Sequence, residues 1–258
     1  MELAGRVAIV TGGGTGIGRA TALRLARSGV KALVVNYSRS AVAAGDTANE
    51  AKALGAEAVT HRADVSDETQ VKEMVASTLD RFGHVDILVN NAGTTRFIPH
   101  PDLDALTDEV WNEILAVNLK GTFFCCRAAA PALKEAGGAI VNIASIAAHR
   151  ASGSSIVYAV SKAGIVQLTR ALALALAPDV RVNSVSPGLV STQWFSRSFG
   201  DEAAAAQEET FARTTPLRRV ATPDDVARAV VSLLENDLIT GQDLVVDGGK
   251  NITYQSVV

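Results

Sequence analysis

The chain has few cysteines and no long uncharged apolar run. Its two cysteines, Cys125 and Cys126, are neighbours in a predicted helix, where they are badly placed to bond each other or to chelate a metal, so we expect no disulfide and no metal site. No uncharged apolar run reaches about 18 residues, and the opening MELAGRVAIVTGGG lacks the pattern of a signal peptide. We therefore expect a cytoplasmic protein with no membrane partner.

A broad basic surface is also missing. The formal net charge is −3, the pI is about 5.8, and lysine and arginine are scattered along the chain, which argues against nucleic acid as a partner. Aromatic residues make up only 5% of the 258 residues while hydrophobic residues make up 48%, so the core must be aliphatic. This length and composition suit one α/β domain spanning residues 1–258.

Short apolar runs alternate with longer helical patterns along the whole chain. The first helical pattern has Ile17, Thr21 and Leu25 at four-residue spacing, and Gly29 is suited to end it. Most of the runs are continuously apolar, as strands covered on both faces are. With right-handed crossovers they predict a single-domain doubly wound Rossmann fold with a parallel sheet of about seven strands. The predicted strands are residues 7–10, 32–35, 58–62, 87–89, 139–143, 180–185 and 244–246.

The stretch TGGGTGIGRA, residues 11–20, follows the first predicted strand. Glycines between a strand and a helix let a pyrophosphate approach the backbone, where its charge faces the free N–H groups of the helix. Gly12, Gly16 and Gly18 would serve this approach. A tight structural turn also favours glycine, so the pattern alone leaves both interpretations open.

A second group of polar residues lies further along the chain. Tyr158 and Lys162 in YAVSKAG stand four residues apart, so they share one helical face. Ser145 ends the apolar stretch AIVNIAS, at the carboxyl edge where open α/β sheets bind ligands. An ordinary amphipathic pair is the alternative for the first two residues. Together, the three side chains are predicted to converge beside a cofactor.

With these motifs in this order, the chain resembles the short-chain dehydrogenase/reductase family over nearly its whole length. The marks are TGGGTGIG, DV at Asp64 and Val65, NNAG from Asn90, Asn118 in AVNLKGTF, Ser145, YAVSK and SPGLVST. The nearest relatives it resembles are 3-oxoacyl-carrier-protein reductases and bacterial glucose dehydrogenase-like enzymes. The resemblance implies hydride transfer between a nicotinamide cofactor and a carbonyl or secondary alcohol.

The resemblance also implies catalytic roles. Tyr158 would be the acid/base, Ser145 would bond the substrate oxygen, and Lys162 would also hold the nicotinamide ribose. Asn118 would help to hold a water relay that reaches Lys162. One part follows from electrostatics: forming a tyrosinate at pH 7 costs about 4 kcal/mol, and an ammonium roughly 5 Å away offsets on the order of 3 kcal/mol of it.

Cofactor contacts are implied in the same way. Asp64 and Val65 would meet the adenine, and Val190 and Thr192 the nicotinamide carboxamide, while Asn90 would either border the adenosine ribose or serve structure alone. The predicted cofactor-binding residues are Gly12, Thr15, Gly16, Ile17, Gly18, Asn36, Ser38, Arg39, Asp64, Val65, Asn91, Ala92, Gly93, Tyr158, Lys162, Pro187, Gly188, Val190 and Thr192.

The residues after the second predicted strand bear on cofactor choice. An NAD enzyme generally places a carboxylate there for the ribose 2′-hydroxyl, and no carboxylate occurs here before Asp46. Ser38 and Arg39 instead suit a 2′-phosphate, so NADP(H) is favoured. Thr15 stands where many NADP-dependent relatives carry a basic residue, so NAD(H) stays possible.

Substrate identity is the least determined feature. Residues 188–215 fall where the family keeps a substrate lid, and aromatic side chains there would either close over an apolar substrate or pack within the protein. Those aromatics are Trp194, Phe195, Phe199 and Phe211. His149, Arg150, Arg96 and Phe97 are interpreted as solvated loop residues. Arg218 departs from the glycine that many relatives carry after Pro-Leu.

The sequence thus favours an NADPH-dependent ketoreductase of 3-oxoacyl reductase type. The alternatives are an NAD-dependent alcohol or sugar dehydrogenase and a non-catalytic nicotinamide-binding regulatory protein; a methyltransferase would have no use for Ser145, Tyr158 and Lys162. The helices predicted at about 118–134 and 158–177 carry more apolar surface than one sheet face needs. We therefore expect a homotetramer, with a homodimer as the second possibility.

Overall fold

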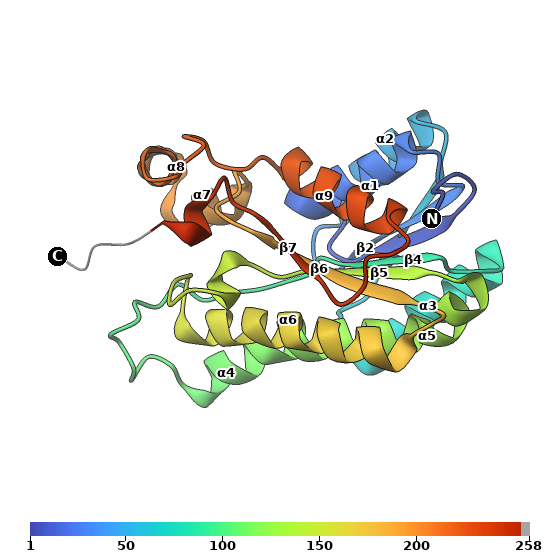
Figure 1. The fold of residues 1–258 in the computed structure, drawn as a ribbon, viewed down its shortest axis with the longest axis horizontal. Helices are drawn as coiled ribbons and strands as arrows, with labels where there is room; N and C mark the ends of the chain where they lie inside the picture. Colours follow the sequence, from blue (N-terminus) through green and yellow to red (C-terminus); the bar gives the residue numbers. More distant parts are fainter. Residues whose placement is uncertain (254–258) are drawn as a thin grey trace.

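The structure, a computed structural model, describes residues 1–253 except for the side chains at positions 193, 195 and 197. Within this part, a seven-stranded parallel sheet has the order β3-β2-β1-β4-β5-β6-β7 (Figure 1). The strands are β1 (Val7–Val10), β2 (Ala32–Tyr37), β3 (Glu57–Arg62), β4 (Ile87–Asn90), β5 (Ala139–Ile143), β6 (Arg181–Pro187) and β7 (Asp243–Val246). The predicted doubly wound Rossmann fold is confirmed.

Helices cover both faces of the sheet (Figure 1). On one face lie α1 (Gly16–Arg27), α2 (Ala41–Ala53) and α9 (Pro223–Glu235); on the other lie α3 (Glu68–Phe82), α5 (Thr122–Ala136) and α6 (Ile156–Leu176), with α4 (Asp108–Leu115) packed against α6. Because strand order reverses between β2-β1 and β4-β5, the carboxyl end of β1 is the topological switch point where such sheets bind ligands.

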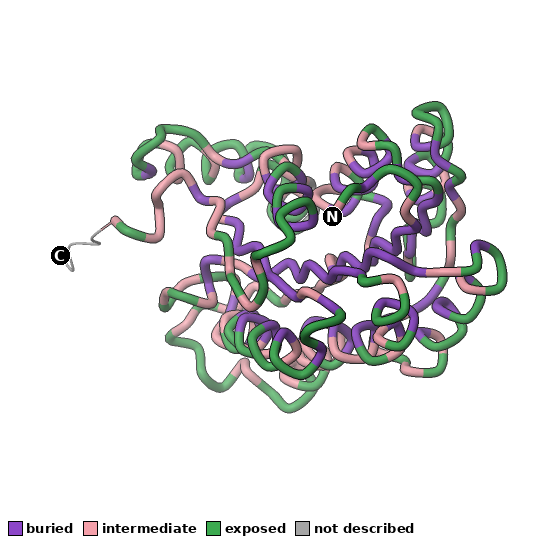
Figure 2. Tube along the Cα trace, turned by 45° about the vertical axis from the view of Figure 1, so that its right-hand side comes forward, coloured by how far each residue is buried: buried purple, intermediate pink, exposed green. Residues whose placement is uncertain are grey.

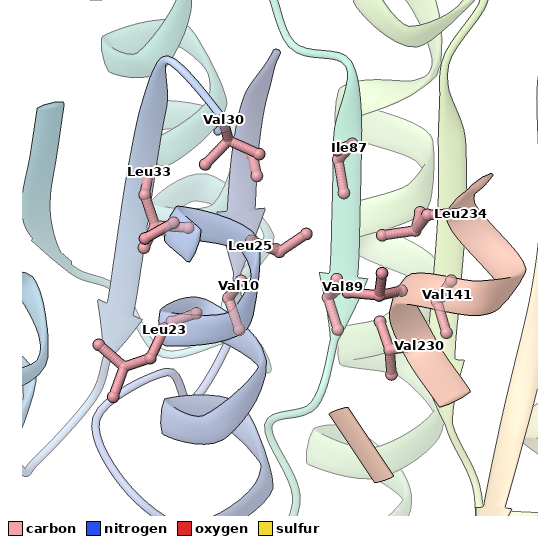
Figure 3. Packing of buried hydrophobic residues seen from close by; sticks show 14 of the residues in the cluster. Val10, Leu23, Leu25, Val30, Leu33, Ile87, Val89, Val141, Val230 and Leu234 are labelled. Atoms are coloured by element: carbon pink, nitrogen blue, oxygen red, sulfur yellow. The ribbon is translucent and has the colours of Figure 1, made fainter. Parts of the chain in front are cut away.

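The core is aliphatic, as the composition requires. Leu23 and Leu25 of α1 pack beside Val10, and Val230 and Leu234 of α9 lie over β4 and β5 (Figure 3). Figure 2 shows buried residues concentrated along the central strands, with exposed residues on the outer faces of the helices. Burial on both faces explains why most strands are continuously apolar rather than alternating.

The helix predicted from residue 118 is not a regular α-helix at its start. A π-helical turn, Ala116–Gly121, precedes α5. The side-chain amide of Asn118 bonds to both backbone groups of Thr94, and Gly121 lies so close to Val65 that a Cβ would come within 2.8 Å of Val65 Cγ2. These tertiary contacts accompany a widened turn that apolar spacing does not predict.

The segment 188–215 forms two helices beside the carboxyl edge of the sheet, α7 (Gln193–Phe199) and α8 (Asp201–Arg213) (Figure 1). Arg218, which follows them, has a left-handed φ of 55°. For a residue other than glycine this costs about 1 kcal/mol or more. The Arg218 guanidinium donates a hydrogen bond to the Arg213 carbonyl at the end of α8, which partly offsets this cost.

By length and composition, α6 could cross a membrane. The same helix packs beside the sheet through residues such as Ile165, Val166 and Ala173, and its Lys162 is buried.

Candidate active site

The glycine-rich turn after β1 is shaped mainly by the protein itself. A Cβ at Gly18 would lie 2.3 Å from the carbonyl oxygen of Gly12, and one at Gly12 would lie 3.1 Å from Ala92 Cα. Gly12 and Gly16 both have a left-handed φ, of +60° and +53°, but at Gly16 the nearest atom to an added Cβ is a Thr192 methyl at 3.5 Å. Gly18 therefore allows α1 to pack against the turn, Gly12 allows the loop after β4 to approach it, and Gly16 permits the left-handed backbone at its open side.

Buried polar side chains hold this turn in place. Asn91 Nδ2 donates to the carbonyls of Thr11 and Gly12, at 3.0 and 3.1 Å. Asn36, predicted to contact the cofactor, is 1% exposed; its Oδ1 accepts from Gly12 N at 3.3 Å and its Nδ2 donates to Ala63 O at 3.0 Å. Asn36 and Asn91 therefore fix the turn. Because Asn36 is buried, its side chain is not accessible to a cofactor.

The N-terminus of α1 fits an anionic group. Its first turn has no acidic residue, and the N-cap residue Thr15 is exposed and makes no side-chain capping bond. The partial positive charge of the helix end is therefore left without a carboxylate of the chain to neutralise it. A pyrophosphate is the kind of group that such an end binds.

The three residues predicted to converge do so at the carboxyl ends of β5 and β6. Ser145 follows β5 and hydrogen-bonds the Tyr158 hydroxyl, while Lys162 lies one turn further along α6 with Nζ 5.7 Å from the centre of the Tyr158 ring. Ser155 caps α6 by accepting a bond from Tyr158 N at 3.2 Å. The helix begins just before Tyr158, so Tyr158 and Lys162 occupy successive turns of one face.

Burial perturbs both titratable groups. Desolvation raises the pKa of Tyr158, and the hydrogen bond with Ser145 lowers it by less. Desolvation also lowers the pKa of Lys162 to about 8. The sequence argument counted attractions that favour the tyrosinate and left out the loss of solvent, which in the chain alone raises the pKa of Tyr158.

Lys162 is suited to hold a diol. The residue is 5% exposed, and its ammonium carries three N–H donors and gives one of them to the Ile143 carbonyl at 2.8 Å. Gly93 leaves the backbone open beside it, since a Cβ there would lie 3.9 Å from Lys162 Nζ and 3.5 Å from Asn118 Oδ1. Asn118 itself binds the loop after β4 and Ser161 of α6, so its side chain joins these two elements.

After β2, Ser38 and Arg39 are exposed, and the first turn of α2 has no acidic residue. Within residues 1–253, Arg39 forms no ion pair. Asp64 accepts bonds from Ser66 N and Oγ, at 2.9 and 2.6 Å. Asn90 is 4% exposed and donates to Asn142 Oδ1 at 2.9 Å, which favours its structural interpretation.

A cavity of about 460 Å³ lies between the loop after β4, α4 and α7, and its lining residues do not include Ser145, Tyr158 or Lys162. The rings of Phe97, which lines it, and Phe199 meet edge to face at 4.7 Å, and Arg96 pairs with Glu113 at 2.8 Å. The side chain of Phe195, another of the aromatics predicted for the lid, is not among those that the structure describes. Arg96 keeps 59% of its side chain exposed, as expected of a solvated loop residue, whereas Phe97 packs against Phe199.

His149 and Arg150 were also expected to be solvated; both keep exposed surface, and both in addition have polar partners in the fold. His149 pairs with Asp243 at 2.8 Å, and Arg150 donates to the Lys250 carbonyl. Both partners lie about a hundred residues away in the sequence, so local sequence pattern carries no signal for either contact.

Comparison with known proteins agrees with this geometry. Residues 12–251 match the family model described as enoyl-(acyl carrier protein) reductase. The ketoacyl reductase 2 assigned to the granaticin polyketide synthase of Streptomyces violaceoruber is 47% identical over 95% of this chain and 96% of its own length. A 3-oxoacyl-[acyl-carrier-protein] reductase of Synechocystis is 37% identical over 96% and 97% of the two chains. A solved structure described as a short-chain dehydrogenase/reductase from Burkholderia xenovorans superposes with a TM-score of 0.89 at 32% identity, covering 96% of this chain and 98% of that one.

The chain belongs to the short-chain dehydrogenase/reductase family. It is an oxidoreductase that uses a nicotinamide cofactor and acts on a carbonyl or secondary alcohol. The free end of α1, the left-handed Gly16 and the spare donors of Lys162 fit the pyrophosphate and ribose of that cofactor.

The lowered pKa of Lys162 predicts a pH dependence. The kcat/KM for the reduced cofactor, which reports on the free enzyme, should fall as the pH rises through about 8, because the neutral amine is a weaker donor without charge. The loss should be roughly tenfold at one unit above that pKa. Tyr158 does not contribute in this range, since its pKa is raised.

Lys162→Arg is the matched variant, because a guanidinium stays protonated beyond about pH 12. Its activity should be lower, but the fall near pH 8 should disappear from a stopped-flow or steady-state pH profile. A fall of the same size and midpoint in Lys162→Arg would show that another group titrates.

Proposed function

We propose that this protein is an NADPH-dependent reductase of 3-oxoacyl thioesters. The observation that carries the proposal is the Ser145–Tyr158 hydrogen bond with the Lys162 ammonium beside the same ring. Two relatives with ketoacyl or 3-oxoacyl reductase names, similar over at least 95% of this chain, support the substrate class.

Each residue of the site has a distinct role in this proposal. The nicotinamide, when bound, supplies the hydride for the carbonyl carbon. The Tyr158 hydroxyl donates its proton to the carbonyl oxygen, and its raised pKa keeps that proton in place at neutral pH. Ser145 donates a hydrogen bond to the same oxygen and so stabilises charge that develops there. Lys162 binds the ribose hydroxyls, and its charge favours the tyrosinate left after proton transfer.

Asn118 helps to position Lys162. Its side chain ties the loop after β4 to Ser161, one residue before Lys162, and its carbonyl lies in the π-helical turn. A water held at that carbonyl would return protons toward Lys162. The other cofactor-binding residues predicted from the sequence contact the cofactor directly in this proposal. Asn36 instead acts through the glycine-rich turn that it holds.

We further propose that the chain is one catalytic domain whose residues 188–215 act as the lid. The contact of Phe199 in α7 with Phe97 supports this, because it joins the segment 188–215 to the loop after β4 through apolar side chains. An apolar acyl chain is the kind of substrate that such side chains would cover.

The test measures NADPH and NADH consumption with 3-oxoacyl thioesters, simple ketones, quinones and sugars, and NAD(P) reduction with polyols. We expect the highest kcat/KM with a 3-oxoacyl thioester and NADPH. Tyr158→Phe should lower kcat by at least about a hundredfold with little change in cofactor Kd, since it removes only the proton donor.

A higher kcat/KM for oxidation of a polyol with NAD would favour the alternative of an alcohol or sugar dehydrogenase. A D-threitol dehydrogenase of Mycolicibacterium smegmatis, 38% identical over 97% of this chain, is the reason to test polyols. Cofactor binding without turnover on every substrate would favour a regulatory protein. Full turnover by Tyr158→Phe would disprove the assigned acid.

Cofactor preference rests on Arg39. A charge-assisted bond from its guanidinium to the 2′-phosphate is worth roughly 1.5–3 kcal/mol, so Arg39→Ala should lower kcat/KM for NADPH by about ten- to a hundredfold and leave NADH nearly unchanged. Lys52→Ala, at the far end of α2, is the matched control and should change neither value. An unchanged NADPH/NADH ratio in Arg39→Ala would remove Arg39 from cofactor selection.

For assembly we propose a homotetramer. On α6, Leu174 is 84% exposed and Val160 is 44% exposed, which leaves apolar surface that the chain does not cover. Leu174→Arg should therefore lower the molar mass in light scattering at micromolar concentration, whereas Val42→Arg, at an exposed site on α2, should not. A dimeric wild type would support the second possibility, and a monomer would refute both.

A further inference from the structure

A short hydrogen-bonded turn after β5 joins Ser145 to His149. Ser145 caps a short 3₁₀ turn, Ile146–Ala148, by accepting a bond from Ala147 N at 3.1 Å. The backbone of His149 closes the same turn by donating to Ile146 O at 3.0 Å. The two side chains therefore stand at opposite ends of one hydrogen-bonded unit, and a shift of one end moves the other.

His149 is fixed by a nearly buried carboxylate. Its Nε2 lies 2.8 Å from Asp243 Oδ2, and the Asp243 side chain is only 6% exposed. Ser184 and Ser186 of β6 donate to the other carboxylate oxygen, at 2.6 and 3.0 Å. A buried carboxylate with partners on both oxygens holds a fixed position, so it is a firm anchor for the imidazole.

This contact spans two neighbouring strands. Ser145 follows β5, which pairs with β6, whereas Asp243 begins β7 on the far side of β6. At the Ser145 end the chain is held by the bond from Ala144 N to Val185 O at 2.8 Å. At the His149 end, Nε2 meets Asp243 of β7 and also lies 3.4 Å from Ser186 Oγ of β6. The turn is therefore held to β6 by its backbone at one end and to β6 and β7 by the imidazole at the other, and loss of the imidazole leaves it free to pivot about the first end.

We infer that His149 and Asp243 are positioning residues that hold the Ser145 hydroxyl toward Tyr158. The inference rests on the proposed function, in which Ser145 bonds the substrate oxygen. Neither residue touches the reacting atoms; both act through the orientation of the 3₁₀ turn. A misplacement of about 1 Å at a reacting group is enough to slow catalysis by up to about a hundredfold.

The variants should keep the fold. Arg150, the next residue, separately ties the loop to the Lys250 carbonyl, and Ile98 N bonds Ser154 O at 2.8 Å further along. His149→Ala therefore leaves the loop attached at two other points. His149→Gln retains a side-chain donor that can reach Asp243, so it is the conservative variant.

The experiment is a double-mutant cycle on kcat with a 3-oxoacyl thioester and NADPH. His149→Ala should lower kcat by about ten- to a hundredfold and leave cofactor Kd within about twofold, while His149→Gln should recover most of the loss. In a Ser145→Ala background, His149→Ala should change kcat by less than about twofold, because the group it positions is already gone. Asp243→Asn should behave as His149→Ala does and should not add to it.

His84 offers a matched control. It forms the same kind of contact with a buried aspartate, Asp86, at 3.3 Å, but just before β4, at the amino edge of the sheet. His84→Ala should leave kcat unchanged, and circular dichroism with thermal unfolding reports on the fold of every variant.

Additive losses for His149→Ala and Ser145→Ala would overturn the inference alone, because His149 would then act on something other than Ser145. A rise in KM with kcat unchanged in His149→Ala would also overturn it, as would a fall in kcat of His84→Ala equal to that of His149→Ala. If Ser145→Ala itself left kcat unchanged, the role of Ser145 in the proposed function would fail, and the inference would fail with it.

Discussion

The site depends on the close approach of α1 to the turn after β1. With 2.3 Å between a Cβ at Gly18 and the Gly12 carbonyl oxygen, any side chain there would push the helix away from the sheet. The approach brings the free N-terminus of α1 to the switch point of the sheet and lets Asn91 bond the carbonyls of the turn. The glycines are thus required first by how the protein packs on itself, and the anion site is a consequence.

A second constraint is the burial of Tyr158 and Lys162 together. Desolvation pushes the pKa values of both groups toward their neutral forms, and this opposes the tyrosinate that a charged lysine would favour. In the chain alone the tyrosine therefore keeps its proton, which suits the donor needed for reduction. The same burial makes the ammonium a strong donor with few competitors, because little water reaches it.

Much of the fold followed from local pattern. The predicted limits of β1 and β5 agree with the structure, since their apolar runs are buried on both faces. The strand β2 extends two residues further, to Tyr37, because Asn36 and Tyr37 pair with β3 although they are polar or half-buried. The π-helical turn around Asn118 was missed, because contacts with Thr94 and Val65 accompany it and apolar spacing carries no trace of them.

The sequence by itself determined the family, the sheet and the residues that meet around Tyr158, because each motif lies at the end of a strand or on one helical face, where spacing dictates position. Only the tertiary structure decided which loop residues are anchored. His149 and Asp243 are 94 residues apart, and their contact arises because β6 lies between β5 and β7 in the sheet. Spacing along the chain governs local geometry, whereas the pairing of distant strands is a property of the folded whole.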